Sequence, residues 1–489
     1  MTRTLTAASL ALLLSSTSAL ALEGKALFES LVGDKPDRFA YGSIEETAPD
    51  SFVLSDVKMT DKGGKVSTAK TITFKGFRED GKRLAIGEMT ASDFVGPIVN
   101  KDRDDGRFVA ETFTLSDARA PREIFGGDIE SVKDERVVVG AMQMTALKGD
   151  QDGDGTDDFG LARFAVDGLD VPLDWRMNPE MAKAATGPAA EPLTMASMSL
   201  DDLTADGPQG SFKLASFALK DLRVPTTLEA GALDWVKVYS SMNMGAVSFA
   251  MGDKPVFTME SVAAAIKEAG ENAIESTSAI EGIFVDLTAI PDPKFQELAR
   301  SLDYSELRGR IAGDGSYDTA SGEVVVDDLI VDIQNVAKLT IGYKMSGYTP
   351  ELANRINAAQ MQASQGGSPN VMEVMALLGE LMLESVTVEL QDDSITKRLL
   401  DFQASQMSTT GDQLAAGAPM FIALGMGQLK MPEFTQKVAG AVGTFLQNPG
   451  TLTVTAKPST PVSFAQLMQA SQQAPRTVIE MLNVDVTAQ

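Results

Sequence analysis

The sequence predicts an α+β protein, built mainly from an extended, curved antiparallel β-sheet and ending in a helix-rich C-terminal third. After residue 33, apolar and polar residues alternate in short runs up to about residue 250, which is the period of a half-buried strand. After Pro350, apolar residues instead recur every three to four positions, as they do on amphipathic helices. At 489 residues and 44% hydrophobic content, the chain can bury a sizeable core.

Residues 307–345 predict three consecutive antiparallel strands, the first two joined by the turn residues 318–322. In the second strand the alternation shifts at Asp327 and Asp328, as a β-bulge would require. We expect one dry face and one wet face. The predicted apolar face consists of Leu307, Gly309, Ile311, Gly313, Gly315, Tyr317, Val324, Val326, Leu329, Val331, Ile333, Leu339, Ile341, Tyr343 and Met345.

Local periodicity and start and stop signals predict the other elements. The last helix is the best marked, because Ser463 and Gln466 form a capping box and Val462 with Leu467 a hydrophobic staple. The predicted helices are 25–33, 261–269, 295–302, 352–359, 371–382, 395–402, 438–446 and the one after Ser463, and the C-terminal strands are 386–390, 452–456 and 484–486.

Changes of composition divide the chain into four predicted segments. The stretch between Trp175 and Pro192 is rich in Ala and Pro and lacks strand alternation, and Pro350 precedes the change to helical periodicity. We expect a signal peptide, an N-terminal β-rich region, a second β-rich region and a C-terminal α+β region. Their boundaries are 1–21, 22–175, 176–350 and 351–489.

A short motif recurs, in which an Asp follows two alternating apolar residues and a polar one. The copies are FVLSDV at 52–57, FTLSDA at 113–118, MSLDDL at 198–203, FALKDL at 217–222 and VVVDDL at 324–329. One interpretation is a line of carboxylates that binds cations. The other, which the irregular spacing favours, is that each Asp marks a strand end or a bulge.

The charge balance and the missing residue types exclude several classes of function. The net charge is -26, so no segment supplies the basic face that a nucleic acid requires, and an anionic membrane would repel the average surface. With no histidine and no cysteine, disulfides, thiolate chemistry and histidine-based catalysis are excluded.

Candidate nucleophile motifs are incomplete. Ser394 and Lys397 match the S-x-x-K spacing of penicillin-interacting enzymes, as do Ser67 and Lys70, but the partner motifs S-D-N and K-T-G are missing. Ser67 lies in a strand pattern, where this spacing points the wrong way. We therefore predict a protein that is not an enzyme and binds no organic cofactor; a hydrolase that uses carboxylates alone is a third alternative.

The first residues predict export. Arg3 supplies a positive start, residues 10–14 an apolar stretch, and Ala19 and Ala21 the small residues before a cut after Ala21. No later run predicts a transmembrane segment in the mature chain. We expect a periplasmic location.

Residues 150–158 (DQDGDGTDD) predict a candidate metal site. Oxygen ligands at positions 1, 3, 5, 7 and 9, with a Gly at position 6, are the pattern of a calcium loop, although position 12 lacks the usual Glu. A solvated acidic turn explains the same residues, and both interpretations stay open. The predicted ligands are Asp150, Asp152, Asp154, Thr156 and Asp158.

Eight methionines lie between Met361 and Met431, among apolar residues of amphipathic helices. They predict either ordinary core or an adaptable lining for a lipid or a partner helix. Together with the one-sided strands, they predict a non-enzymatic envelope protein that binds a lipid or another apolar ligand in a groove between sheet and helices. The alternative is a structural or adaptor protein of the envelope, braced by calcium and steered by its acidic surface to an envelope protein partner.

The segment from Ser316 to Gly347, the repeated Asp motif and the helical end resemble exported bacterial proteins of the YdgA-like family. More loosely, the chain is similar to AsmA-type envelope proteins, whose long curved sheets form an apolar groove. This resemblance implies a cell-envelope role and lipid handling. It supplies no functional residues, because no catalytic motif is shared.

Overall fold

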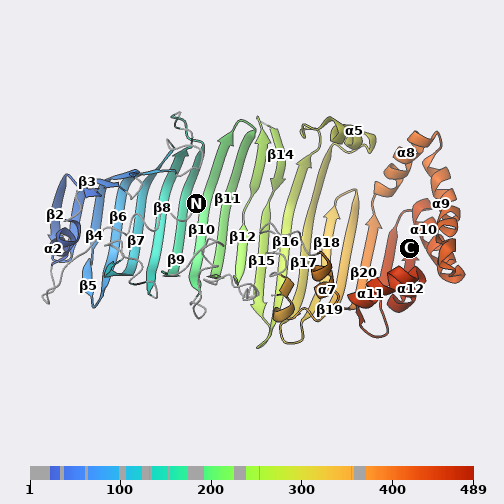
Figure 1. Ribbon diagram of the computed structural model, residues 1–489. Helices are drawn as coiled ribbons and strands as arrows, with labels where there is room; N and C mark the ends of the chain where they lie inside the picture. The colour runs from blue at the N-terminus through green and yellow to red at the C-terminus, as the bar shows by residue number, and fades with distance from the viewer. Residues whose placement is uncertain are drawn as a thin grey trace. The chain divides into compact units, whose positions relative to one another are not determined.

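In the computed structural model (Figure 1), the chain forms two compact units. Unit 1 comprises Met1–Glu229 and Lys237–Ala246, and unit 2 comprises Ala230–Val236 and Val247–Gln489. The predicted signal peptide, residues 1–21, lies outside the described part of the chain, as does most of the stretch between Trp175 and Pro192. The described residues are 23–33, 38–60, 64–98, 106–123, 132, 135–151, 153, 155–173, 192–224, 238–252, 254–353, 355–356 and 371–489.

Unit 1 is an antiparallel sheet of long strands. β1 and β2 both pair with β3, and from there the pairing runs through β4, β6, β7, β8, β9, β10, β11 and β12, with β5 on β6. The boundary predicted at residue 175 falls between β9 and β10, which are hydrogen-bonded neighbours in one unit. The strands are β1 Phe39–Ala40, β2 Ser43–Ala48, β3 Ser51–Thr60, β4 Val66–Lys75, β5 Arg78–Asp80, β6 Arg83–Pro97, β7 Arg107–Pro121, β8 Arg136–Asp150, β9 Phe159–Pro172, β10 Leu193–Gly207, β11 Gly210–Val224 and β12 Ser241–Met244.

The core of unit 1 forms on one face of this sheet. Helix α2 (Gly24–Val32), at the predicted position, buries Leu27, Phe28 and Leu31 against it. Phe28 lies 5.0 Å from the ring of Phe52 and contacts four further aromatic rings. Each fully buried aromatic or aliphatic side chain stabilises the fold by roughly 1.5–3 kcal/mol, so α2 is firmly held at this end of the sheet.

Residues with a left-handed backbone conformation, that is, with positive φ, form two lines that run across the long strands of unit 1. One line holds Asp117 in β7, Gly168 in β9 and Asp221 in β11, and the intervening strands place Gly140 and Ala196 opposite them. A Cβ at Gly140 would lie 2.8 Å from the Cβ of Asp117, so only glycine fits there.

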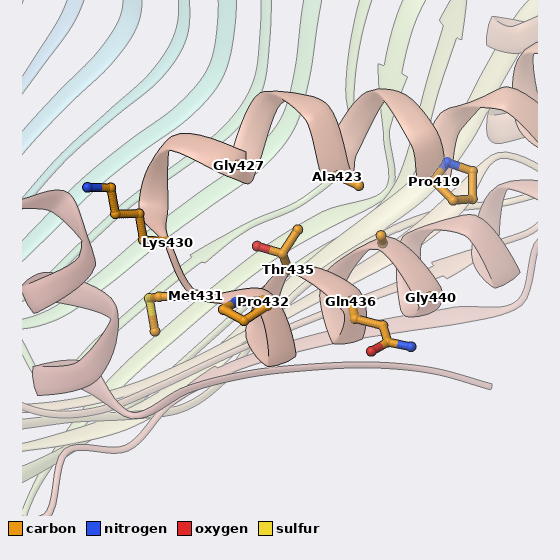
Figure 2. Close-up of a pocket in the computed structure, with 10 residues that line it drawn as sticks. Pro419, Ala423, Gly427, Lys430, Met431, Pro432, Thr435, Gln436 and Gly440 are labelled. Atoms are coloured by element: carbon orange, nitrogen blue, oxygen red, sulfur yellow. The ribbon is translucent and has the colours of Figure 1, made fainter.

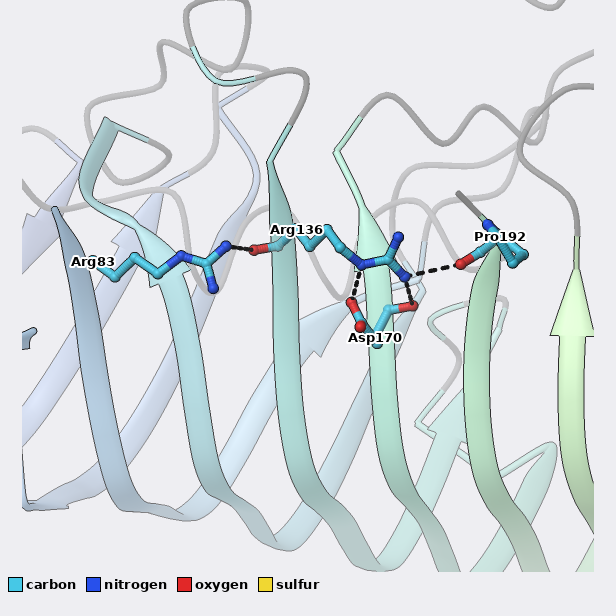
Figure 3. Close-up of polar contacts among 4 residues, drawn as sticks. All are labelled: Arg83, Arg136, Asp170 and Pro192. Atoms are coloured by element: carbon cyan, nitrogen blue, oxygen red, sulfur yellow. Dashed lines mark hydrogen bonds and ion pairs between the residues drawn. The ribbon is translucent and has the colours of Figure 1, made fainter. Parts of the chain in front are cut away.

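The second line holds Asp56 in β3, Asp93 in β6, Ala146 in β8 and Asp202 in β10, with φ between 47° and 54°. A left-handed residue interrupts the pleat and bends its strand, and Figure 3 shows these strands curving along their length. Four of the five repeated Asp motifs contribute to the two lines. The interpretation of the motif as a bulge or strand-end marker agrees with this geometry.

A chain of hydrogen bonds links the ends of four strands in unit 1 (Figure 3). Arg83 donates to the carbonyl of Arg136 at 3.0 Å. The guanidinium of Arg136 donates in turn to the carboxylate of Asp170 at 2.6 Å and to the carbonyl of Pro192 at 2.9 Å. These half-buried contacts hold the curved strands in line where the backbone pairing ends.

Unit 2 combines further antiparallel strands with helices. β13 pairs with β14 and β14 with β16; the pairing then runs through β17, β18, β19, β20 and β21 to β23, with β15 on β16 and β22 on β20. The strands are β13 Val247–Met251, β14 Lys254–Met259, β15 Ser261–Glu268, β16 Ala273–Asp286, β17 Glu306–Asp318, β18 Glu323–Ile333, β19 Ala337–Ser346, β20 Met382–Asp392, β21 Thr451–Ala456, β22 Val462–Ser463 and β23 Val484–Ala488.

Helices form at five of the positions predicted in unit 2, although the helix predicted at 371–382 ends at Leu378 and Met382 begins β20. The described residues 350–353 and 355–356 are also helical, where a helix is predicted at 352–359. The helices Gly411–Met426 and Pro475–Leu482 were not predicted. The capping box of Ser463 and Gln466 is confirmed at the start of α11. The helices are α5 Pro293–Ser301, α7 Val371–Leu378, α8 Ile395–Met407, α9 Gly411–Met426, the 3-10 turn η3 Gly427–Leu429, α10 Pro432–Gln447, α11 Phe464–Gln473 and α12 Pro475–Leu482.

The three-stranded meander is confirmed as β17, β18 and β19, and the α+β class with it. The register between β18 and β19 shifts between Val326 and Leu329, which confirms the predicted bulge at Asp327 and Asp328. The helix predicted at 261–269 is wrong, because these residues form β15. Their Ala-rich run has a high helix propensity, but its pairing with β16 along the whole strand prevails.

We expect the left-handed residues to be costly to replace with β-branched ones. Asp202→Val should lower the free energy of unfolding by about 1–2 kcal/mol, because a β-branched residue is strained at positive φ. Asp202→Gly, at the same exposed site, should change it by less than about 0.5 kcal/mol. Urea unfolding of both variants measures the difference, and equal stability would contradict the role of the bend.

The pair of Lys437 in α10 and Asp485 in β23 should make stability pH-dependent. The ammonium of Lys437 lowers the pKa of Asp485 below its ordinary value of 3.8, and the N–H of Val486 adds to this. A lowered folded pKa means that this stabilisation is present above the unfolded pKa and is lost as the pH falls through the folded one.

Both side chains are about half exposed, so Asp485→Asn should cost less than about 1 kcal/mol at neutral pH and nothing at a pH below the folded pKa. Urea unfolding at the two pH values tests this. A cost that stays constant with pH would show that the ion pair contributes nothing.

Candidate apolar ligand site

Cross-strand pairing in unit 2 assembles apolar side chains into continuous rows on one face of the sheet. Directly paired residues in an antiparallel sheet share a face and lie about 5 Å apart. The first row is Ile311, Val331, Leu339, Leu390 and Leu452. The second is Leu329, Ile341, Val388, Val454 and Val486. The third is Val326, Tyr343, Val386, Ala456 and Val484.

We call these fifteen residues the apolar sheet face. Its members in β17, β18 and β19 are residues predicted from the sequence to share one face, and the register confirms that they do. The predicted dryness, however, is wrong. Every residue of β19 is half-buried, whichever face it belongs to, and Leu329 and Val454 are 37% and 36% exposed.

Unit 1 shows how the same arrangement looks when it is covered. There, residues of equivalent rows such as Leu54, Ile72 and Ala91 are 0%, 4% and 2% exposed. In unit 2, α10 packs on β21 and β23 and buries Val486, while the rows between β17 and β20 keep access to solvent. A large contiguous apolar surface that is exposed on a folded protein commonly marks an interaction or ligand-binding site.

The opposite face of the same strands is charged and paired. Lys344 contacts Glu323 at 2.8 Å and Glu384 at 3.5 Å, and the hydrogen bond to Glu323 raises the pKa of Lys344. Arg310 lies 3.5 Å from Asp332. The two faces therefore differ in chemistry, and in β17 and β20 the charged and polar residues are the more exposed ones. An apolar ligand would be attracted by the apolar face alone.

A second apolar surface of unit 2 is a groove of about 530 Å³ between α9 and α10 (Figure 2). Apolar and small residues make most of its wall, and Lys430 and Met431 lie at one end. Its lining consists of Pro419, Ala423, Gly427, Lys430, Met431, Pro432, Thr435, Gln436, Ala439 and Gly440.

Glycines control the width of this groove. A Cβ at Gly443 would lie 2.5 Å from the Cγ of Pro419, so the two helices touch where this glycine allows it. At Gly427 and Gly440 an added Cβ would meet nothing within 4 Å, so the helices diverge there. The groove is therefore open space that a side chain at Gly440 could occupy without strain.

The methionines that predicted a ligand lining are not brought together. Met361 lies outside the described residues. Met407 and Met420 are exposed on α8 and α9, and Met382 lies in β20; of the described methionines, Met431 is the one that lines the groove. The apolar sheet face depends instead on Val, Ile and Leu, and the alternation that predicted these strands was its signal.

The predicted calcium loop is described in part. Asp150 accepts hydrogen bonds from the N–H groups of Gly153 and Gly155 at 2.6 and 2.9 Å, and Asp158 accepts one from Gln151 at 2.5 Å. These bonds form a tight acidic turn and leave further oxygen lone pairs for a cation.

The ligands Asp150, Thr156 and Asp158 are described, whereas Asp152 and Asp154 are not. Among the described residues, those of the loop included, no group of three acidic side chains is placed to hold a metal ion. The calcium site stays a prediction.

The S-x-x-K residues have other partners. The hydroxyl of Ser394 donates to the carbonyl of Asn335 at 2.6 Å and contacts the hydroxyl of Tyr304 at 2.7 Å, while Lys397 pairs with Asp401 at 3.1 Å. Ser67 and Lys70 lie in β4, as the strand pattern predicted. In this geometry neither lysine is directed at its serine.

Comparison with known proteins adds one match. A family model described as "Uncharacterized protein" matches residues 330–489, which run from the end of β18 through β23 and include α7 to α12. No curated protein matches the chain. In the part of the chain that the structure describes, no helix has the length and apolarity to cross a membrane.

Calcium at about 1 mM should raise the melting temperature, because extracellular acidic loops bind calcium in this range and binding stabilises the folded state. Asp154→Asn should remove the increase, since it withdraws a charged ligand. Thermal unfolding with calcium or with chelator measures it, and magnesium at the same concentration is the control. A melting temperature that does not change with calcium would show that residues 150–158 form a solvated acidic turn and not a calcium site.

Proposed function

We propose that this chain is a non-enzymatic envelope protein of the periplasm that binds a lipid or another long apolar molecule on the apolar sheet face of unit 2. The observation that carries the proposal is the half-exposed state of three aligned apolar rows. In a stable sheet such rows are normally covered, and covering them with a ligand would remove their apolar surface from water.

The dimensions of the face suit an acyl chain. Five strands about 4.8 Å apart give each row a length of about 19 Å, although α10 packs on β21 and β23 and buries Val486 at the end of the second row. The three rows lie side by side. Each methylene group that leaves water contributes about 0.8 kcal/mol to binding. A chain laid along a row thus gains affinity without any polar contact, which accords with the apolar composition of the first two rows; in the third row Tyr343 carries the one hydroxyl.

The proposal places the ligand on the sheet, and a sheet substitution should weaken binding. Val388→Asn puts an amide in the centre of the second row, where it must lose hydrogen bonds to water when a ligand covers it. We expect about tenfold weaker binding, which corresponds to about 1.4 kcal/mol. Displacement of a fluorescent fatty acid, with native mass spectrometry of the purified protein, measures the change.

The matched control is Thr387→Asn, the next residue of β20, which is exposed on the opposite face. It should leave binding unchanged. Equal loss in both variants, or a wild-type protein that carries no lipid and binds no probe, would overturn the proposal.

A second pair of variants locates the ligand. Gly440→Leu fills the groove between α9 and α10, while Gly440→Ala changes helix propensity without filling it. Both should bind the probe like the wild type. Binding that survives Val388→Asn and is lost in Gly440→Leu would move the ligand from the sheet to the helices.

A further inference from the structure

The C-terminal half of α9 carries the most exposed large hydrophobic side chains among the described residues. Met420, Phe421 and Leu424 are 67%, 62% and 77% exposed. Their spacing of three and four residues places them on one side of the helix. We call these three residues the α9 stripe.

The stripe is held outward by contacts on the other side of the helix. Ala415 is 3% exposed, and Pro419 packs on Gly443 of α10. The start of the helix is closed by a capping box between Thr410 and Gln413. Rotation of α9 to bury the stripe would break these contacts, so its exposure is a property of the packed structure.

The sequence around the stripe is depleted of charge. From Gln413 to Pro432 the one charged residue is Lys430, in a chain whose net charge is -26. An acidic protein is repelled by an anionic surface and desolvates its carboxylates at great cost in any apolar one. The segment from Gln413 to Pro432, which carries the stripe, contains no carboxylate that would incur either penalty.

We propose that the α9 stripe docks on a lipid bilayer with zwitterionic head groups, inserting its three side chains at the boundary between head groups and acyl chains. Shallow insertion of a helix face needs no partner surface and gains affinity from a few apolar side chains. A second copy of the chain fits less well, because a stable protein interface buries about 800 Å² per partner, far more than three side chains on one helix supply.

The docking surface differs from the apolar sheet face, and it stands whether or not that face binds lipid. Docking is measured with vesicles and lipid binding with a soluble probe, so the failure of one is distinguishable from the failure of the other.

Flotation of the full chain with phosphatidylcholine vesicles tests the proposal. The triple variant Met420→Gln, Phe421→Gln, Leu424→Gln should bind vesicles at least tenfold more weakly than the wild type. The control Leu399→Gln, Met407→Gln replaces apolar residues of α8 that are 47% and 58% exposed, and it should bind within twofold of the wild type. All five side chains are exposed, so both variants should keep the wild-type melting temperature.

Three outcomes would overturn the proposal: a wild type that does not float, equal losses in the two variants, or a concentration-dependent dimer in sedimentation that the triple variant abolishes. The last would assign the stripe to a second copy.

Salt dependence tests the kind of bilayer. Binding to phosphatidylcholine should not change with salt, whereas binding to vesicles rich in phosphatidylglycerol should be weaker at low salt and recover as salt screens the net charge. Tighter binding to the anionic vesicles at low salt would overturn the zwitterionic assignment.

Discussion

Antiparallel pairing with a constant register is the constraint on which the rest of each unit depends. Because side chains alternate with a period of two, a slip of one residue would send every apolar side chain to the opposite face. The bulge in β18 absorbs one extra residue, and Leu329 therefore still pairs with Ile341 on the apolar face. Continuous rows from β17 to β21 exist because this correction is local.

The two units differ in how far the apolar face of their strands is covered. In unit 1 the left-handed residues bend the long strands, and α2 adds a cluster of aromatic rings at one end. Most of the apolar side chains there are buried. In unit 2 the buried residues Leu352, Leu377 and Leu381 form a small separate cluster, α10 packs on β21 and β23, and the central rows remain half-exposed. The difference in cover, not in composition, distinguishes a core from a candidate binding surface.

Charge is distributed so that apolar surface can remain in water. The polar faces of the sheets carry paired charges such as Lys344 with Glu323, and the chain is strongly acidic as a whole. Net charge keeps a protein with exposed apolar rows soluble through repulsion between copies. The uncharged run from Gln413 to Leu429, which makes up most of α9, is therefore a distinct feature of the sequence.

The sequence by itself determined the α+β class, the three-stranded meander with its bulge, the capping box at the start of α11 and the members of the apolar face in β17, β18 and β19, because alternation, turn residues and capping boxes act over a few neighbouring residues. Tertiary structure decided the rest. Residues 261–269 pair as a strand despite their helix propensity, and Met420 and Met431 face different surroundings on adjacent elements. Above all, only the packing of distant elements decides whether an apolar side chain is covered: Leu54 and Leu329 occupy similar strand patterns, yet they are 0% and 37% exposed.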